Sequence, residues 1–280
     1  MPRASYLMKS QEQQDLFQSM LSTSPDGWIC YEQPLSERVR TLLRLEYLFK
    51  RVHWAQNGSM VWDSRTTIET LIDIIAVLSR SDIKKEIMKE LGRHALTLDS
   101  LAQNPKVDPS RLTRVADSVN DLLLRLKELN ASFGQILKHH ELFNAVRQRS
   151  SIPAGSCDFD IPAYHFWLQK PAEHRIEDLQ LWVGSFSLLS ESVNLCLALV
   201  RDSGVSSHET AKEGFFQRNL ESTSPCQMIR VFLASNSPTY PEISAGRHRF
   251  SVRFMEQPQS NERANQSQED ISFKLVSCII

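Results

Sequence analysis

The spacing of apolar residues changes once along this 280-residue chain, near residue 205. Before that point apolar residues recur at intervals of three and four, and the first such series is Leu35, Val39, Leu42, Leu45, Leu48 and Val52. After it they alternate with polar residues. The first spacing is typical of amphipathic helices and the second of half-buried strands. The sequence therefore predicts an α+β protein, with a mainly α-helical N-terminal domain at 28–204 and a small antiparallel β-sheet domain at 205–280.

Local signals divide the helical part into segments. Ser36 is placed to start the first helix, and Asp108 followed by Pro109 gives a capping side chain with a proline at the first helical position. We expect a single helix over 133–149. A second helix is expected after a start signal at 63–67, a third after the junction at 79–82, and further helical segments at 161–169, 176–186 and 188–201.

Two stretches lack the composition of a folded core. Residues 1–27 are polar and rich in Gln and Ser, so they are expected to form a flexible extension, and we allow for a short strand at 28–32. Residues 256–270 contain no large apolar side chain. They are expected to form a long, poorly ordered loop between the last two strands.

One strand carries a row of arginines. In the segment 247–254, Phe250, Val252 and Phe254 alternate with polar positions, and the opposite face carries Arg247, Arg249 and Arg253. Adjacent arginines on a rigid strand repel one another, so this row is expected to meet an anionic partner. A solvated face that only keeps the sheet soluble is the alternative.

Neighbouring strand-like segments extend the basic row. Segments 214–220, 228–234 and 271–278 alternate in the same way, and the last two add Arg230, Phe232 and Lys274 to their polar faces. Residues 212–255 hold six Lys or Arg against three Asp or Glu, whereas the whole chain has 32 against 33. The four segments together predict one antiparallel sheet with a basic, partly aromatic outer surface.

The sequence contains no catalytic or metal-binding pattern, so we expect neither an enzyme nor a cofactor. His139, His140 and Glu141 do not share a helical face, and Cys157 lies beside Asp158, which disfavours a reactive thiolate. The five cysteines are dispersed. They fit a reducing cytoplasm, and no apolar window is long enough to span a bilayer.

Several motifs resemble the ZapD family of bacterial division proteins, nearly from end to end. They are Tyr31-Glu32-Gln33-Pro34-Leu35, residues 40–46, 146–155, Phe159-Asp160-Ile161-Pro162, His165-Phe166-Trp167-Leu168, residues 240–244 and residues 249–255. The resemblance implies a helical domain with a separate β domain. It also implies a cytoplasmic, dimeric protein of the mid-cell division ring that binds the C-terminal tail of the tubulin-like protein FtsZ and cross-links its filaments.

The same resemblance implies which residues bind the tail. On the strands they are Arg249, Arg253, Arg230, Arg247, Lys274 and Phe232, and on the helices Arg44, Arg80, Arg147, Arg149 and His165. No membrane or nucleic-acid partner is implied. The alternative function is a single-stranded nucleic-acid-binding module, which would use the same basic and aromatic sheet face for phosphates and bases.

Overall fold

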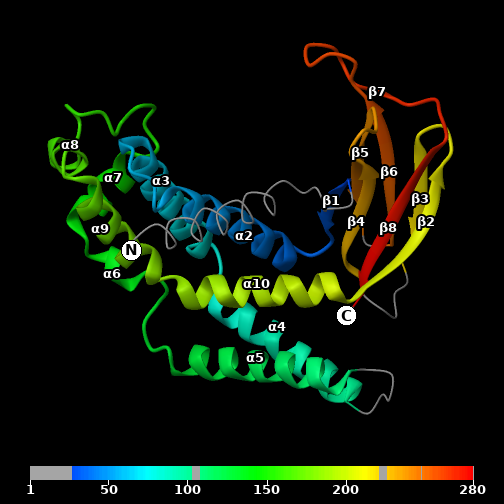
Figure 1. The fold of residues 1–280 in the computed structure, drawn as a ribbon, viewed down its shortest axis with the longest axis horizontal. Helices are drawn as coiled ribbons and strands as arrows, with labels where there is room; N and C mark the ends of the chain where they lie inside the picture. Colours follow the sequence, from blue (N-terminus) through cyan, green and yellow to red (C-terminus); the bar gives the residue numbers. More distant parts are fainter. Residues whose placement is uncertain (1–26, 103–107, 221–225, 247, 280) are drawn as a thin grey trace, which may run out of the picture. The chain divides into compact units, whose positions relative to one another are not determined.

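The computed structural model describes residues 27–102, 108–220, 226–246 and 248–279. Helices follow one short strand and occupy the chain as far as residue 202, after which antiparallel strands continue to residue 279 (Figure 1). The predicted α+β class is therefore confirmed. Residues 1–26 of the extension expected at 1–27 and the candidate Arg247 lie outside the described residues.

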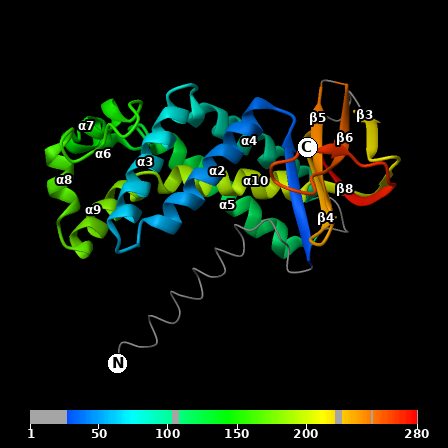
Figure 2. The same ribbon diagram turned by 90° about the horizontal axis from the view of Figure 1, so that it is seen from above.

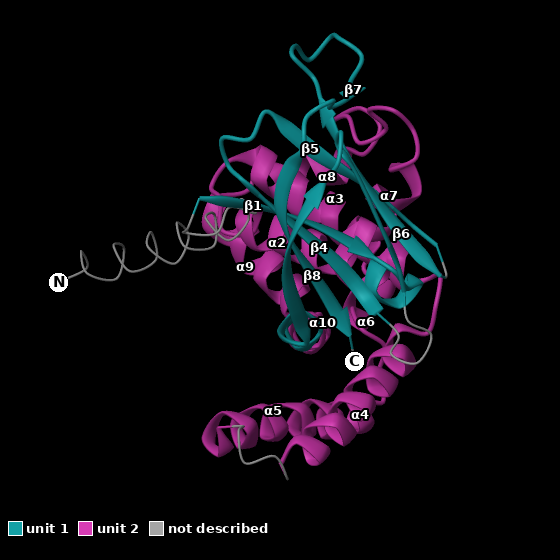
Figure 3. Ribbon diagram, turned by 90° about the vertical axis from the view of Figure 1, so that its right-hand side faces the viewer, with its two compact units in different colours: residues 1–40, 198–280 teal, residues 41–197 magenta. Residues whose placement is uncertain are grey.

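The chain divides into two compact units (Figure 3). We call residues 41–197 the helical unit, and residues 1–40 with 198–280 the sheet unit. Our expected boundary near residue 205 differs from this division, because the N-terminal strand β1 (Trp28–Pro34) pairs with a strand near residue 230 and so belongs with the sheets. Helices α2 (Glu37–Ala55) and α10 (Ser187–Asp202) each run from one unit into the other.

The helices follow one another closely along the chain. After α2 come α3 (Val61–Leu78), α4 (Ile83–Leu101), α5 (Pro109–Glu128), α6 (Gln135–Lys138), α7 (Glu141–Arg149), α8 (Pro162–Leu168), α9 (Ala172–Gly184) and α10. The start signals act as expected: Val39 N–H donates to Ser36 Oγ at 3.3 Å, and Ser110 N–H donates to Asp108 Oδ1 at 2.9 Å. The Ser110 hydroxyl also donates to Asp108 Oδ1, at 2.8 Å, and the hydroxyl and the N–H together hold the pKa of Asp108 below its usual value.

The expectation of a single helix over 133–149 is wrong. The chain forms α6 and α7 instead, and the break falls at His139 and His140. His140 Nδ1 accepts a hydrogen bond from Phe143 N–H at 3.3 Å and so caps α7. A side-chain cap of this kind satisfies a backbone donor that has no partner inside the helix, and it makes a new helix start favourable.

One buried arginine joins two helices inside the helical unit. Arg175 of α9 is only 4% exposed, yet it donates to Ser59 O at 2.8 Å and to Lys170 O at 3.2 Å, and it also bonds the Ser64 hydroxyl. Ser59 lies just before α3, Ser64 lies in α3, and Lys170 lies just before α9. The hydrogen bonds offset the cost of burying the guanidinium and hold α3 against α9.

The strands form two sheets. Their bounds are β2 (Gly204–Ala211), β3 (Phe215–Asn219), β4 (Cys226–Ala234), β5 (Thr239–Ala245), β6 (Arg249–Glu256), β7 (Asn265–Gln266) and β8 (Ile271–Ile279). Sheet A has the order β1-β4-β8-β2, and sheet B has the order β3-β6-β5 with β7 beside β6. The prediction of one sheet is wrong, because β4 and β8 belong to sheet A whereas β3 and β6 belong to sheet B.

Both sheets bury their apolar faces in one core. Phe273 of sheet A lies with its ring centroid 5.0 Å from that of Phe254 and 5.3 Å from that of Phe216, both of sheet B. The fully buried members of this core are Ala211, Ile229, Val231, Leu233, Phe250, Val252, Phe254, Phe273 and Leu275. Because side chains alternate along a strand, the polar faces of the two sheets point in opposite directions.

The loop after β6 is more ordered than we expected. It contains β7, and Ser267 is buried and donates its N–H to Phe254 O at 2.9 Å. Asp270 accepts from Lys212 Nζ at 2.5 Å and from Glu213 N–H at 3.1 Å, so the loop is tied to the β2–β3 turn. These hydrogen bonds involve backbone groups and polar side chains, so the lack of large apolar residues in the loop did not indicate them.

Replacement of a shared core residue is expected to destabilise the whole sheet unit. Phe254→Ala removes a side chain that is 0% exposed, and we expect it to lower the free energy of unfolding by about 3–5 kcal/mol. The exposed Phe215→Ala is the matched control, with an expected loss below about 1 kcal/mol. Urea unfolding measures both, and equal losses would contradict a core shared by the two sheets.

Candidate functional site

The outer face of sheet B presents two arginines to solvent. Arg249 and Arg253 are both exposed on β6, the central strand of this sheet. Arg253 lies between Phe215 of β3 and Glu242 of β5 in the strand register, and Arg249 lies opposite Asn219. We call this surface the arginine face and define it by Phe215, Gln217, Asn219, Glu242, Ser244, Arg249, Ser251 and Arg253.

The two arginines are available for a ligand. Within the described part of the chain, neither Arg249 nor Arg253 forms a side-chain hydrogen bond or ion pair, although Glu242 lies across from Arg253. Phe215, beside Arg253, is 38% exposed. The face therefore offers two guanidinium forks and an aromatic edge, a combination suited to a peptide that carries carboxylates and apolar side chains.

The outer face of sheet A holds the other strand candidates, in a different setting. Phe232 of β4 has the Arg230 guanidinium 5.0 Å and the Lys274 ammonium 5.5 Å from its ring centroid. These three residues thus come together as the sequence predicted. They lie on the sheet opposite to that of Arg249 and Arg253, so the expected single basic face does not exist.

Arg230 is held by a carboxylate that the sequence analysis missed. Arg230 Nε lies 2.9 Å from Oε1 of Glu32 of β1 in an ion pair, and Arg201 at the end of α10 donates to both Glu32 oxygens at 2.9 and 2.8 Å. All three side chains are mostly buried. Glu32 lies 169 positions from Arg201 in the chain, and only the pairing of β1 with β4 brings it beside Arg230.

The thiols of the sheet unit are not activated. Burial raises the pKa of Cys30 and Cys226, and it raises the pKa of Cys278 to about 12. Nearby Arg230 opposes this shift for Cys30 and Cys278 without overcoming it. These thiols therefore stay protonated at neutral pH and lack the thiolate character of a nucleophile.

Two candidates in the helical unit are engaged with aspartates. Arg149 at the end of α7 donates to Asp160 at 2.8 Å, and His165 Nδ1 of α8 lies 3.0 Å from Asp158 Oδ1. Both residues and their aspartate partners lie in one short segment of the chain, 149–165. Both side chains are therefore already engaged with a carboxylate, which reduces their capacity to bind an anion.

The other helical candidates lie on different elements. Arg147 is exposed on α7, Arg80 is exposed just after α3, and Arg44 is exposed on α2. The three residues therefore come from three separate parts of the helical unit. The structure leaves their functional role as a prediction.

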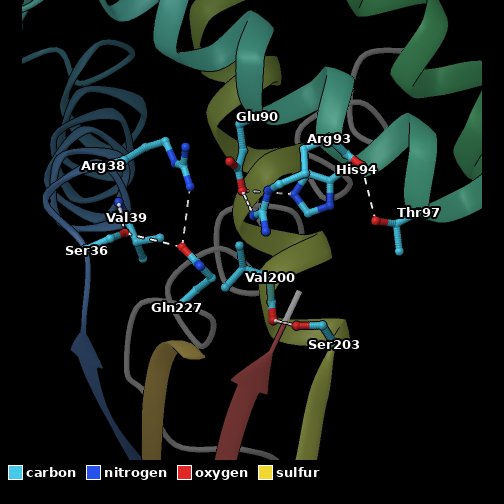
Figure 4. A network of polar contacts seen from close by, with 10 residues as sticks. All are labelled: Ser36, Arg38, Val39, Glu90, Arg93, His94, Thr97, Val200, Ser203 and Gln227. Carbon is cyan, nitrogen blue, oxygen red and sulfur yellow. Dashed lines mark hydrogen bonds and ion pairs between the residues drawn. The ribbon is translucent and has the colours of Figure 1, made fainter. Parts of the chain in front are cut away.

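Figure 4 shows two groups of polar contacts, and each group joins residues within one unit. In the sheet unit, Ser36 and Arg38 each contact Gln227 Oε1 at 3.5 Å, which links the start of α2 to β4. In the helical unit, buried Glu90 of α4 accepts from Arg93 and lies 3.4 Å from His94 Nε2. Spacings of three and four along α4 bring these charges together.

The described residues contain no group of three or more His, Cys, Asp or Glu side chains able to hold a metal ion. Over the same ranges, no single helix is long and apolar enough to cross a membrane, and α9 with α10 meets that length and composition only as a pair bent by 58°.

Comparison with known proteins gives a consistent result. The sequence model of the family described as ZapD, cell division protein, matches residues 43–253. A cell division protein ZapD of Methylococcus capsulatus is 40% identical over 252 residues, which cover 90% of this chain and 98% of the relative. The ZapD proteins of Coxiella burnetii and Chromobacterium violaceum are 37% and 34% identical, over 90% and 89% of this chain and 98% and 99% of the relatives.

Loss of the Glu32 carboxylate is expected to destabilise the sheet unit. Glu32→Gln leaves the guanidinium groups of Arg201 and Arg230 without their counter-charge in a mostly buried site, at an expected cost of about 2 kcal/mol in unfolding free energy. The exposed Glu242→Gln should leave stability unchanged. Urea unfolding compares them, and an unchanged Glu32→Gln would show that the ion pairs contribute no net stability.

Proposed function

Because this chain belongs to the ZapD family of cell division proteins, we propose that it acts in division by binding the C-terminal tail of FtsZ and, as a dimer, cross-linking FtsZ filaments. The observation that supports this most directly is the arginine face. Its two exposed arginines lack side-chain partners among the described residues, and they lie on a rigid central strand beside an exposed phenylalanine. A flexible tail with apolar and charged side chains has the matching chemistry.

Arginine suits this task for a geometric reason. Its planar guanidinium can donate two parallel hydrogen bonds to one carboxylate, and such charge-assisted bonds are stronger than neutral ones. Arg249 and Arg253 are four residues apart on one strand, so their side chains leave the same face. The face can therefore engage two carboxylates of an extended peptide, while Phe215 provides apolar contact.

The two sheets receive different roles in this proposal. Arg249 and Arg253 bind the tail directly. Arg230 acts mainly in holding β1, β4 and α10 together, since its guanidinium is already paired with Glu32. Phe232 and Lys274 lie beside it on the same face and are secondary candidates for tail contact.

Dimerisation would convert a weak peptide site into a filament cross-link. A site of micromolar strength corresponds to about 8 kcal/mol of binding free energy. Two such sites on one dimer face a polymer that repeats its tail, so the second binding event gains from high local concentration without any new contact. Bundling therefore follows from valency, and the site itself need not be tight.

The nucleic-acid alternative uses the same arginine face. Guanidinium groups bind phosphates, and Phe215 could stack on a base. Single-strand binding weakens steeply with salt, because each phosphate contact releases counterions. The family membership favours the division role over this alternative, and a salt titration against oligonucleotide and tail peptide separates the two.

Reversal of charge on the arginine face is expected to abolish tail-dependent bundling. Arg249→Glu/Arg253→Glu replaces two donors with carboxylates that repel the tail, and we expect at least a ten-fold loss of binding, about 1.4 kcal/mol or more. The measurement is co-sedimentation with polymerised FtsZ, full length and with its tail deleted. Wild-type protein should pellet only with the tailed polymer.

The matched control reverses two exposed cations of α5. Arg114→Glu/Lys127→Glu makes the same change in net charge within the helical unit and should bundle as wild type does. Equal binding by wild type and the Arg249→Glu/Arg253→Glu variant would remove the arginine face from the mechanism. Binding that ignores tail deletion would remove the tail.

A further inference from the structure

Three large aromatic side chains are exposed at one end of the helical unit. Trp62 at the start of α3 is 68% exposed, Phe159 in the turn before α8 is 82% exposed, and Phe166 on α8 is 72% exposed. Both Figure 1 and Figure 2 place α7, α8 and the N-terminal end of α3 at this end of the helices. We call Trp62, Phe159 and Phe166 the aromatic surface.

A single arginine fixes the segments that carry these rings. The Arg65 guanidinium lies 5.5 Å from the Trp62 ring centroid and 5.0 Å from that of the buried Tyr164. It also donates to Ser156 O at 3.0 Å and to Asp158 Oδ1 at 3.3 Å. Arg65 thus ties α3 to the turn before α8 and to α8 itself, so the exposed rings stand on a preorganised base.

The charges around the aromatic surface favour an acidic ligand. Asp158 is already paired with Arg65 and with His165, and Asp160 with Arg149. Arg147 and Lys170, by contrast, are exposed cations with no ion pair among the described residues. The two aspartates that flank Phe159 are therefore paired, whereas Arg147 and Lys170 of the same segment remain available to an anionic ligand.

We propose that the aromatic surface is a docking surface for a short acidic peptide with bulky apolar side chains. The rings of Phe159 and Phe166 take the apolar side chains, and Arg147 with Lys170 attracts the carboxylates. Exposed aromatics on a rigid base are typical of binding hot spots. The proposal rests on the proposed function, with the FtsZ tail as the peptide that occupies the surface, and it adds contacts in the helical unit to those proposed for the arginine face.

A peptide fits these observations better than a lipid surface. Asp158 and Asp160 directly flank Phe159 in the sequence, and both are held in ion pairs. Insertion of Phe159 into a bilayer interface would draw these ion pairs out of water, and burial of charges costs free energy even when they are paired. A peptide can direct its own carboxylates to Arg147 and Lys170 and leave both aspartates in their existing pairs.

A mutant cycle with the full chain tests this proposal. The variant is Phe159→Ser/Phe166→Ser, and the probes are an FtsZ tail peptide and the same peptide with its large apolar residues replaced by serine. We expect the variant to bind the intact peptide roughly 10- to 100-fold more weakly than wild type. The serine peptide should bind wild type as weakly as the intact peptide binds the variant. Its affinity for the variant should be no lower than its affinity for wild type. Fluorescence anisotropy measures all four affinities.

The matched control removes two other exposed side chains of the helical unit. Tyr47→Ser/Leu181→Ser should bind the intact peptide as wild type does, since both residues are 66% exposed and lie outside the aromatic surface. Unchanged affinity of Phe159→Ser/Phe166→Ser, or equal losses in the control, would overturn the proposal. So would a loss of flotation on anionic vesicles with peptide affinity intact, because it would assign the rings to a membrane.

The same measurements separate this inference from the proposed function. If Arg249→Glu/Arg253→Glu binds the peptide normally while Phe159→Ser/Phe166→Ser does not, the arginine face fails and the aromatic surface stands. The reverse pattern overturns the aromatic surface alone. If wild type does not bind the tail peptide at all, both proposals fail together.

Discussion

The packing of Phe273 against Phe216 and Phe254 is the constraint on which the sheet unit depends. It joins sheet A to sheet B through one apolar core, and strand alternation then sends every second side chain outward. The direction of each basic residue follows from this packing. Arg249 and Arg253 leave through the outer face of sheet B, and Arg230 and Lys274 leave through that of sheet A. The core therefore excludes a functional surface that carries these four residues on one face of a sheet.

Sequence patterns predicted the elements better than their pairing. Helical spacing and the caps at Ser36 and Asp108 are local, and the alternation in β6 and β8 is also local, so the α+β class followed directly from the sequence. The pairing partners of a strand depend on contacts between distant residues. Nothing in the sequence near Trp28–Pro34 indicates that this segment pairs with β4. For the same reason we predicted one sheet containing β3, β4, β6 and β8, whereas the structure divides these strands between two sheets.

The same difference between local patterns and distant contacts applies to the candidate site. The sequence correctly indicated exposed arginines on β6, because alternation alone decides which of its residues face outward. It could not show that Arg230 is paired, because Glu32 reaches it only through the pairing of β1 with β4. The exposed rings of Phe159 and Phe166 were also missed. A sequence pattern marks a large aromatic residue as a core residue by default, and only the fold reveals that these rings lie outside it.

Cross-linking of a polymer by the proposed dimer requires only a weak interaction that is repeated many times. In the two proposals, charge on the arginine face would provide steering and orientation, and apolar contact on the aromatic surface would slow dissociation. Salt screens electrostatic attraction far more than apolar contact. Under these proposals the apolar contribution to tail binding would persist when ionic strength rises, whereas the contribution of the arginines would fall.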